Sequence, residues 1–188
     1  MLRTLVTFCA IGLSSALVYG QVPFPKLPQP ITTFSHEDKE WNVEATANPK
    51  RGPRYHAPTP TSIPGGRVIK TLELKGLLEA SKSVVVIDVL EARSRESIPG
   101  AFWLSGAGDG QFFAAETSRF SIVLEKLTGG NKAQPIVFLC WNSECWLSYN
   151  AALHALEAGY KDVIWYRGGT ESWKGASLEL KKLESTNW

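Results

Sequence analysis

The sequence predicts an α/β fold in which a parallel sheet is flanked by helices, preceded by a proline-rich irregular arm. Short continuous apolar runs such as Ile136–Leu139 recur after residue 67, which is typical of strands buried on both faces. Stretches of helical periodicity, most clearly the one that begins at Trp146, alternate with these runs, and such alternation builds parallel sheets. The arm is predicted because residues 21–66 hold nine of the eleven prolines and show little periodicity.

The first 20 residues are typical of a signal peptide. Arg3 precedes an apolar run over residues 5–18, and Gly20 is a small residue just before a cleavage site at Gln21. The apolar run is shorter than the roughly 20 residues that a membrane-spanning helix needs. The pattern therefore predicts export to the periplasm and no membrane span in the mature chain.

Composition restricts the class of partner and the state of the cysteines. The formal net charge of +2 is small and no basic block is longer than Lys181-Lys182, so we expect no binding to nucleic acid. Removal of the signal peptide leaves only two cysteines, Cys140 and Cys145. An even pair in an exported protein favours a disulfide.

Residues 21–66 leave two interpretations open. Aromatic residues such as Phe34, Trp41 and Tyr55 make this segment too apolar for a free tail, which favours an arm wrapped over the domain that follows. The alternative is a loose linker. Either way, the segment is expected to be largely irregular.

One domain is expected over residues 67–175, with a C-terminal tail over residues 176–188. The glycines of residues 105–110 predict a flexible loop near the site. The expected elements, in chain order, are a strand at 68–69, a helix at 71–80, strands at 84–89 and 102–104, a helix at 112–127, a strand at 136–139, a helix from 146, a strand at 163–166 and a helical turn at 170–173.

The first helix is the one whose start and buried face are clearest in the sequence. Thr71 is expected to cap it, because a threonine side chain can accept a hydrogen bond from the first helical turn. Its buried face is expected to consist of the four leucines Leu72, Leu74, Leu77 and Leu78.

The chemistry is expected in the loop between the strand at 136–139 and the helix that follows. Backbone N–H groups and the helix macrodipole at such a turn favour a thiolate or a bound anion. Cys140 and Cys145 enclose this loop and are the candidate catalytic residues, although a free cysteine at a strand end is often a small core residue. The loop itself consists of Trp141, Asn142, Ser143 and Glu144, and Trp146 follows it.

Two other features of this region bear on its function. Trp141 and Trp146 flank the cysteines and are either packing residues or a surface for a partner or a flat cofactor. No metal site is expected, because structural zinc needs four ligands. The remaining soft donors are the dispersed histidines His36, His56 and His154.

Five short motifs occur in a fixed order between Arg67 and Trp173. They are V-V-V-I-D-V, I-P-G-A, I-V-F-L-C, A-A-x-x-A-L-x-x-x-G-Y and G-G-T-x-x-W. In this order they resemble the rhodanese-like domain. The resemblance implies the rhodanese-like parallel sheet and places Cys140 at the position of the catalytic nucleophile. It gives Asp88 a supporting structural role, accepting hydrogen bonds from a nearby turn.

Four further segments resemble a narrower group of exported proteins. They are C-W-L-S-Y-N-A-A, V-I-W-Y-R-G-G-T-E-S-W, Y-H-A-P-T-P and P-G-A-F-W-L. They are similar to the PQQ-dependent catabolism-associated CXXCW motif proteins. This resemblance implies a functional association with pyrroloquinoline quinone enzymes, with a periplasmic quinoprotein dehydrogenase or its electron acceptor as partner. It assigns no cofactor to the chain itself.

The loop departs from both groups. Four residues separate Cys140 from Cys145, where the narrower group has two, and the loop lacks the Gly and Arg of ordinary rhodaneses. We therefore expect negligible thiosulfate sulfurtransferase activity. Two functions stay open: a disulfide-locked binding or accessory module, and a periplasmic thiol–disulfide oxidoreductase or sulfurtransferase with Cys140 as nucleophile.

Overall fold

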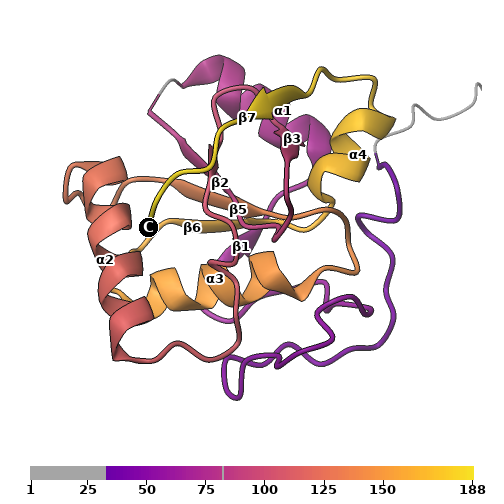
Figure 1. The fold of residues 1–188 in the computed structure, drawn as a ribbon. Helices are drawn as coiled ribbons and strands as arrows, with labels where there is room; N and C mark the ends of the chain where they lie inside the picture. The colour runs from indigo at the N-terminus through magenta and orange to yellow at the C-terminus, as the bar shows by residue number, and fades with distance from the viewer. Residues whose placement is uncertain (1–32, 82) are drawn as a thin grey trace, which may run out of the picture. The chain divides into compact units, whose positions relative to one another are not determined.

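The computed structural model describes residues 33–81 and 83–188, so the expected signal peptide and the first part of the arm lie outside the described residues. Five parallel strands form one sheet in the order β1-β6-β5-β2-β4, and β3 and β7 form a separate antiparallel pair (Figure 1). The elements are β1 (Arg67–Val68), α1 (Thr71–Ala80), β2 (Val85–Asp88), β3 (Arg95–Ser97), β4 (Phe102–Trp103), α2 (Ala114–Thr128), β5 (Ile136–Leu139), α3 (Trp146–Glu157), β6 (Val163–Tyr166), α4 (Gly169–Gly175) and β7 (Lys181–Leu183).

The parallel sheet separates two apolar layers, which confirms the predicted fold class. Side chains alternate along each strand, so Ile136 and Phe138 of β5 pack with α2 and α3, whereas Val137 and Leu139 pack with α1 and α4. Figure 1 shows α2 and α3 on one face of the sheet and α1 and α4 on the other. Because both faces are covered, the central strands are apolar throughout, which is why their runs are continuous in the sequence.

The start of α1 differs from the prediction. Lys70 is the N-cap residue and its backbone N–H donates to Glu73 Oε2, whereas Thr71 is the first helical residue. The Thr71 hydroxyl instead donates to Glu37 Oε2 (2.7 Å) in the arm. The predicted buried face is also wrong at one position, since Leu72 is 44% exposed and Leu74 is the fully buried leucine of this helix. The local sequence predicts that the Thr71 side chain caps α1, but in the structure this side chain bonds to Glu37 of the arm instead.

Residues 105–110, which the composition predicts to be a flexible loop, pack closely against other parts of the backbone. A Cβ on Gly108 would lie 2.2 Å from the carbonyl oxygen of Leu147, and one on Gly110 would lie 2.1 Å from that of Arg51. Both distances are shorter than real Cβ contacts allow, so these positions need glycine for close approach of two backbones. The segment is therefore packed tightly against α3 and the arm.

The C-terminal segment packs on the domain instead of forming a tail. Within residues 176–188, β7 pairs antiparallel with β3, so that Lys182 lies opposite Glu96. The last residue, Trp188, packs against the aromatic rings of Phe112 and Phe120 and donates its indole N–H to Ser105 O (2.9 Å).

Residues 33–66 have no helix or strand, but they are held closely to the domain. Glu37 is buried and accepts hydrogen bonds from the backbone N–H (2.9 Å) and the hydroxyl of Thr71. Burial raises the pKa of Glu37, and these hydrogen bonds oppose the rise. The side chain of Asn150, on α3, accepts from Arg51 N and donates to Arg51 O. For the described part of the arm, a wrapped segment is therefore the correct interpretation.

Candidate functional site

The candidate site lies at the carboxyl edge of the parallel sheet, where the strand register aligns three neighbouring strand ends. Asp88 of β2 pairs with Leu139 of β5, which pairs with Tyr166 of β6. The residues that follow β5 and β6, Cys140 and Arg167, therefore emerge at the same edge as Asp88. This edge is where open α/β sheets hold their ligands.

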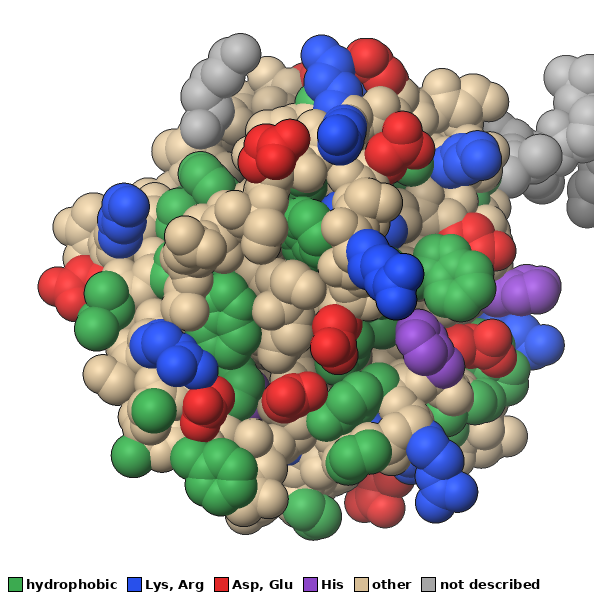
Figure 2. All heavy atoms as spheres, viewed as in Figure 1, with side chains coloured by type: hydrophobic (Ala, Val, Ile, Leu, Met, Phe, Trp, Pro, Cys, Tyr) green, Lys and Arg blue, Asp and Glu red, His purple; other side chains and the backbone are tan. Residues whose placement is uncertain are grey.

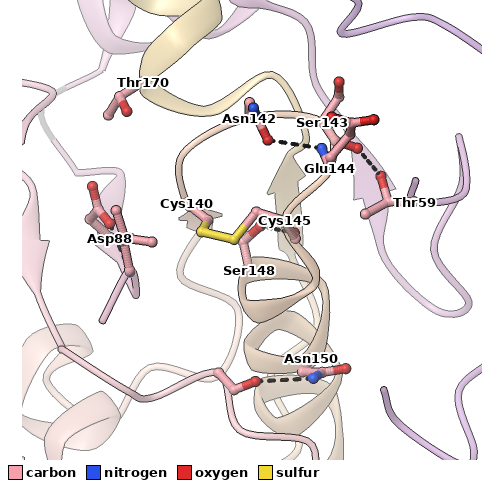
Figure 3. Close-up of a disulfide and its surroundings, with 12 residues drawn as sticks. Thr59, Asp88, Cys140, Asn142, Ser143, Glu144, Cys145, Ser148, Asn150 and Thr170 are labelled. Carbon is pink, nitrogen blue, oxygen red and sulfur yellow. Dashed lines mark hydrogen bonds between the residues drawn. A yellow bond between two sulfur atoms is a disulfide. The ribbon is translucent and has the colours of Figure 1, made fainter. Parts of the chain in front are cut away.

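The two cysteines of the loop form a disulfide. Cys140 directly follows β5, Cys145 is the N-cap residue of α3, and their Cα atoms lie 6.2 Å apart (Figure 3). This separation is in the ordinary range for a disulfide and confirms the expected pairing. Both residues belong to the apolar layer on the α3 side of the sheet, and Cys140 is only 1% exposed and Cys145 0%.

Three backbone N–H groups at the α3 end of the loop are already used. Cys145 N donates to Asn142 O (3.1 Å), and Glu144 N donates to the Asn142 side chain (3.0 Å). Trp146 N, at the start of α3, donates to Tyr55 O of the arm (2.9 Å). A sulfur anion on a loop cysteine is stabilised when such groups point at it, so this loop offers it fewer donors than the sequence suggested.

The arm lies directly against the cysteine loop. His56 forms an isolated antiparallel bridge with Cys145, flanked by a hydrogen bond from Ala57 N to Glu144 O (2.8 Å). The buried Thr59 hydroxyl donates to Ser143 O (2.6 Å). Figure 3 shows Thr59 on one side of the disulfide loop and Asp88 and Thr170 on the other. The loop is thus held between the arm and the sheet edge.

The two tryptophans beside the cysteines have different roles. Trp146 is 5% exposed, packs edge-on against Tyr149 and donates its indole N–H to Pro58 O (3.1 Å). Trp141 is 49% exposed, with His56 edge-on to its ring at 5.8 Å between centroids. Of the two interpretations left open by the sequence, packing applies to Trp146 and an accessible aromatic surface applies to Trp141.

Asp88 is the centre of a buried polar cluster beneath the loop. Its carboxylate accepts from Arg95 Nε (2.7 Å), the Ser97 hydroxyl (2.5 Å) and Leu90 N (3.0 Å). Burial raises the pKa of Asp88, while the Arg95 guanidinium and the Ser97 hydroxyl oppose the rise. These bonds agree with the supporting role that the resemblance implied for Asp88.

Arg95 is a site residue that the sequence reasoning missed. Its Nη2 donates to Cys140 O (3.1 Å) and to the Thr170 hydroxyl (3.0 Å), so it joins the end of β5 to α4. The only trace in the sequence is a cation seven positions after a strand-end aspartate, which is too common a pattern to single out. Arg95 lies under the backbone of the loop, and its guanidinium is engaged by Asp88 and Thr170.

A pocket of about 620 Å³ opens on the Trp141 side of the loop. Its wall is held rigidly, because Trp141 O accepts from Glu171 N (2.9 Å) and a Cβ on Gly169 would lie 2.5 Å from the Trp141 backbone. Asn142 Nδ2 donates to Glu171 (2.7 Å), which ties the loop to α4 a second time. The residues that give the pocket its character are Arg95, Glu96, Trp141, Glu171, Lys174 and Lys182.

The charges around this pocket balance. Glu96 lies opposite Lys182 across β3 and β7, Glu171 and Lys174 lie one turn apart on α4, and Arg95 is paired with Asp88. Figure 2 shows acidic, basic and hydrophobic side chains interspersed on the face of the molecule that it presents. A cradle for a small anion such as thiosulfate requires an excess of cationic donors, which this arrangement does not provide.

The histidines are dispersed in the structure as well. His154 is buried on α3, stacked on Phe112 (3.8 Å between centroids), with Nε2 2.8 Å from Asp109 O. His36 and His56 are exposed arm residues. Within residues 33–81 and 83–188, no three His, Cys, Asp or Glu side chains are grouped to hold a metal ion. Among the helices of this described part, none is long and apolar enough to cross a membrane.

A family model and several solved structures are similar to this chain. The family model of the rhodanese-like domain matches residues 71–176. No protein with a curated description matches the sequence significantly. Solved structures with a similar fold include a thiosulfate sulfurtransferase from Pseudomonas aeruginosa (20% identity, TM-score 0.48, 64% of this chain and 21% of that one). An uncharacterized protein from Saccharomyces cerevisiae is similar as well, with 20% identity, a TM-score of 0.45, and coverage of 60% of this chain and 97% of that one. So is a polysulfide-sulfur transferase homodimer from Wolinella succinogenes, with 16% identity, a TM-score of 0.44, and coverage of 62% of this chain and 79% of that one.

Proposed function

Because the chain belongs to the rhodanese-like domain family, we propose a function for it that departs from sulfur transfer: a binding or accessory module whose loop is locked by the Cys140–Cys145 disulfide. The observation that carries the proposal is the burial of both cysteines, which are 1% and 0% exposed, in the apolar layer on the α3 side of the sheet. Sulfur transfer needs a free thiolate at the position of Cys140 that meets its substrate. A buried disulfide supplies neither.

The polar groups of the loop support the same proposal. A persulfide anion on Cys140 requires several N–H donors aimed at it, whereas Glu144 N, Cys145 N and Trp146 N have other acceptors. The pocket beside Trp141 is balanced in charge and gives a sulfur oxyanion no cationic clamp. The accessible indole at the rim of this pocket is instead a suitable anchor for a partner protein, since tryptophan is enriched at such sites.

The partner is proposed from the sequence motifs. The segments around Cys145 and Gly168 resemble exported proteins associated with pyrroloquinoline quinone catabolism, and residues 1–20 have the pattern of a signal peptide. We therefore assign the protein to the periplasm, serving a quinoprotein alcohol dehydrogenase or its electron acceptor. Mass spectrometry of the mature protein should give an N-terminus near Gln21, and a cytoplasmic protein that retains Met1 would contradict export.

A thiol–disulfide oxidoreductase is the second candidate, and the pairing of two cysteines in one six-residue segment favours it. The reduction potential of the Cys140–Cys145 couple separates the two functions. A potential close to those of thiol–disulfide oxidoreductases would support exchange chemistry, and one below about −300 mV is expected for a structural bridge.

Activity measurements test the main proposal directly. We expect negligible thiosulfate:cyanide sulfurtransferase turnover, and turnover that disappears in Cys140→Ser would overturn that expectation. Deletion of the gene should impair growth on alcohols and lower dehydrogenase activity in the periplasm. Normal growth with unchanged dehydrogenase activity would remove the assignment to quinoprotein catabolism while leaving the disulfide-locked module in place.

A further inference from the structure

The arm segment from Tyr55 to Thr59 contacts the cysteine loop as an extended peptide would. Trp146 N donates to Tyr55 O, Ala57 N donates to Glu144 O, and His56 lies opposite Cys145 between these two bonds. This is the pattern of strand addition, in which backbone bonds hold an extended segment against an exposed edge. The segment lies against the loop at Cys145 itself, the residue that carries one of the two sulfur atoms.

A single buried arginine holds the arm in this position. Arg167 is 1% exposed and directs all five of its guanidinium N–H groups to the arm. Its acceptors are His36 O (3.3 Å), Glu37 O (2.8 Å), Lys39 O (2.9 Å), Thr59 O (3.0 Å) and Thr59 Oγ1 (3.0 Å). The indole of Trp41 lies over the guanidinium, with 4.8 Å between its ring centroid and Cζ.

Thr59 connects this clamp to the cysteine loop. Its hydroxyl oxygen accepts from Arg167 Nε and its hydroxyl hydrogen is donated to Ser143 O (2.6 Å). Thr59 is fully buried, so both bonds are shielded from water and costly to lose. The chain of contacts from Arg167 to Ser143 therefore couples the position of the arm to that of the loop.

We propose that arm residues 55–59, held by Arg167 through Thr59, are a gate that controls chemical access to the Cys140–Cys145 disulfide. With the arm bound, the disulfide is shielded from thiols. When this segment detaches, the loop loses its cover at Cys145 and the disulfide becomes open to exchange. A protein that exchanges thiols with this disulfide must displace the segment first, by the same backbone contacts that the arm makes.

The exchange step itself is conventional. A thiolate of a dithiol reductant attacks one sulfur of the disulfide and forms a mixed disulfide, releasing the other cysteine as a thiolate. The second thiol of the reductant then displaces the remaining cysteine. The reductant leaves as its own cyclic disulfide, two electrons have passed to the protein, and the two cysteine thiolates take up the protons that the dithiol released. The gate changes the rate at which the first thiolate attacks. It does not change the products of the exchange.

The test measures how fast dithiothreitol reduces the disulfide in the mature folded protein, with the released thiols counted by alkylation and mass spectrometry. Thr59→Val removes both hydroxyl bonds with little change in shape, and we expect reduction about tenfold faster than in the wild type. Thr61→Val is the matched control, because Thr61 bonds only to Glu40 on the exposed side of the arm, and its rate should not change.

A second variant and a second measurement separate gating from unfolding. Ala57→Pro removes the N–H that bonds to Glu144 O and should also accelerate reduction. Hydrogen exchange of the β5 amides reports the stability of the sheet in each variant, and we expect its protection to be retained. Rates within about twofold of the wild type in both Thr59→Val and Ala57→Pro would overturn the proposal. Acceleration that matches a proportional loss of β5 protection would overturn it as well, because access would then require global unfolding.

Discussion

On one side of the Cys140–Cys145 loop the arm bonds to the loop backbone, whereas on the other side the indole of Trp141 is half exposed at the rim of a pocket. We call these the covered side and the open side. The backbone of the loop is held on both sides, by hydrogen bonds to the arm on the covered side and to α4 on the open side. What differs is the group that reaches solvent, which is an aromatic ring and not a sulfur atom.

The comparison shows how a chain of this fold can keep a cysteine at the end of β5 without exposing it to solvent. A disulfide consumes the thiol, the arm takes the N–H of Trp146, and Asn142 takes those of Glu144 and Cys145. Fold alone therefore does not determine the activity of this chain, because the site depends on which groups remain free.

The largest expected effect comes from the ion pair beneath the open side. Asp88→Ala leaves the guanidinium of Arg95, which is 9% exposed, without its counter-ion, and breaking a buried pair in this way costs about 3–5 kcal/mol of unfolding free energy. Urea unfolding followed by circular dichroism measures the loss. Arg119→Ala breaks the exposed pair with Glu116 and a contact of the guanidinium with the Trp188 ring (5.9 Å to the centroid), and should change stability by about 1 kcal/mol or less. Equal effects of the two substitutions would show that the pair beneath the loop is not buried in solution.

The two tryptophans test the difference between the sides directly. Trp146→Ala on the covered side removes a buried ring and should lower the unfolding free energy by about 3 kcal/mol. Trp141→Ala on the open side should lower it by less than about 1 kcal/mol, because half of that side chain is already in water. Trp141→Ala should also lower the fraction of the fluorescence that acrylamide quenches, because Trp141 is the most exposed tryptophan of the described residues. A larger loss of stability from Trp141→Ala than from Trp146→Ala would reverse the assignment of the two sides.

The disulfide is expected to contribute less than the Asp88–Arg95 pair or the buried ring of Trp146. The double variant Cys140→Ser, Cys145→Ser opens a short closed loop, and the chain-entropy estimate for that loop is about 2 kcal/mol. Denaturant midpoints of the oxidised wild type and the double variant measure the difference. Full labelling of both cysteines in the native protein without reductant would show that the bridge is absent in solution.

The smallest predicted effect is a pH dependence that arises from the buried His154 on α3. Burial of His154 lowers its pKa below the usual value of 6.5, so the unfolded chain binds a proton at a higher pH than the folded chain does. Stability contributed by neutral His154 is present above that unfolded value and is lost as pH falls from it toward the folded pKa. Unfolding free energies near pH 5 and near pH 7.5 should therefore differ more in the wild type than in His154→Gln. An equal pH dependence in the two proteins would mean that another group is responsible.

The sequence by itself determined the parallel sheet and the position of the loop. Continuous apolar runs mark β2, β5 and β6, because a strand covered on both faces must be apolar at every position. The same local information located Cys140 at the end of β5 and the start of α3 at Trp146, and the even number of cysteines predicted their pairing.

Only the tertiary structure decided which groups of that loop are free. The contacts of Arg167 with the arm join residues about 108 to 131 positions apart, and those of Arg95 with Cys140 and Thr170 join residues 45 and 75 positions apart, distances over which no periodicity or motif extends. The difference in exposure between Trp141 and Trp146 has the same origin, since both are aromatic neighbours of a cysteine in the sequence. Local sequence specifies strands and helices through short-range geometry, whereas burial of a polar or aromatic side chain depends on what distant segments pack against it.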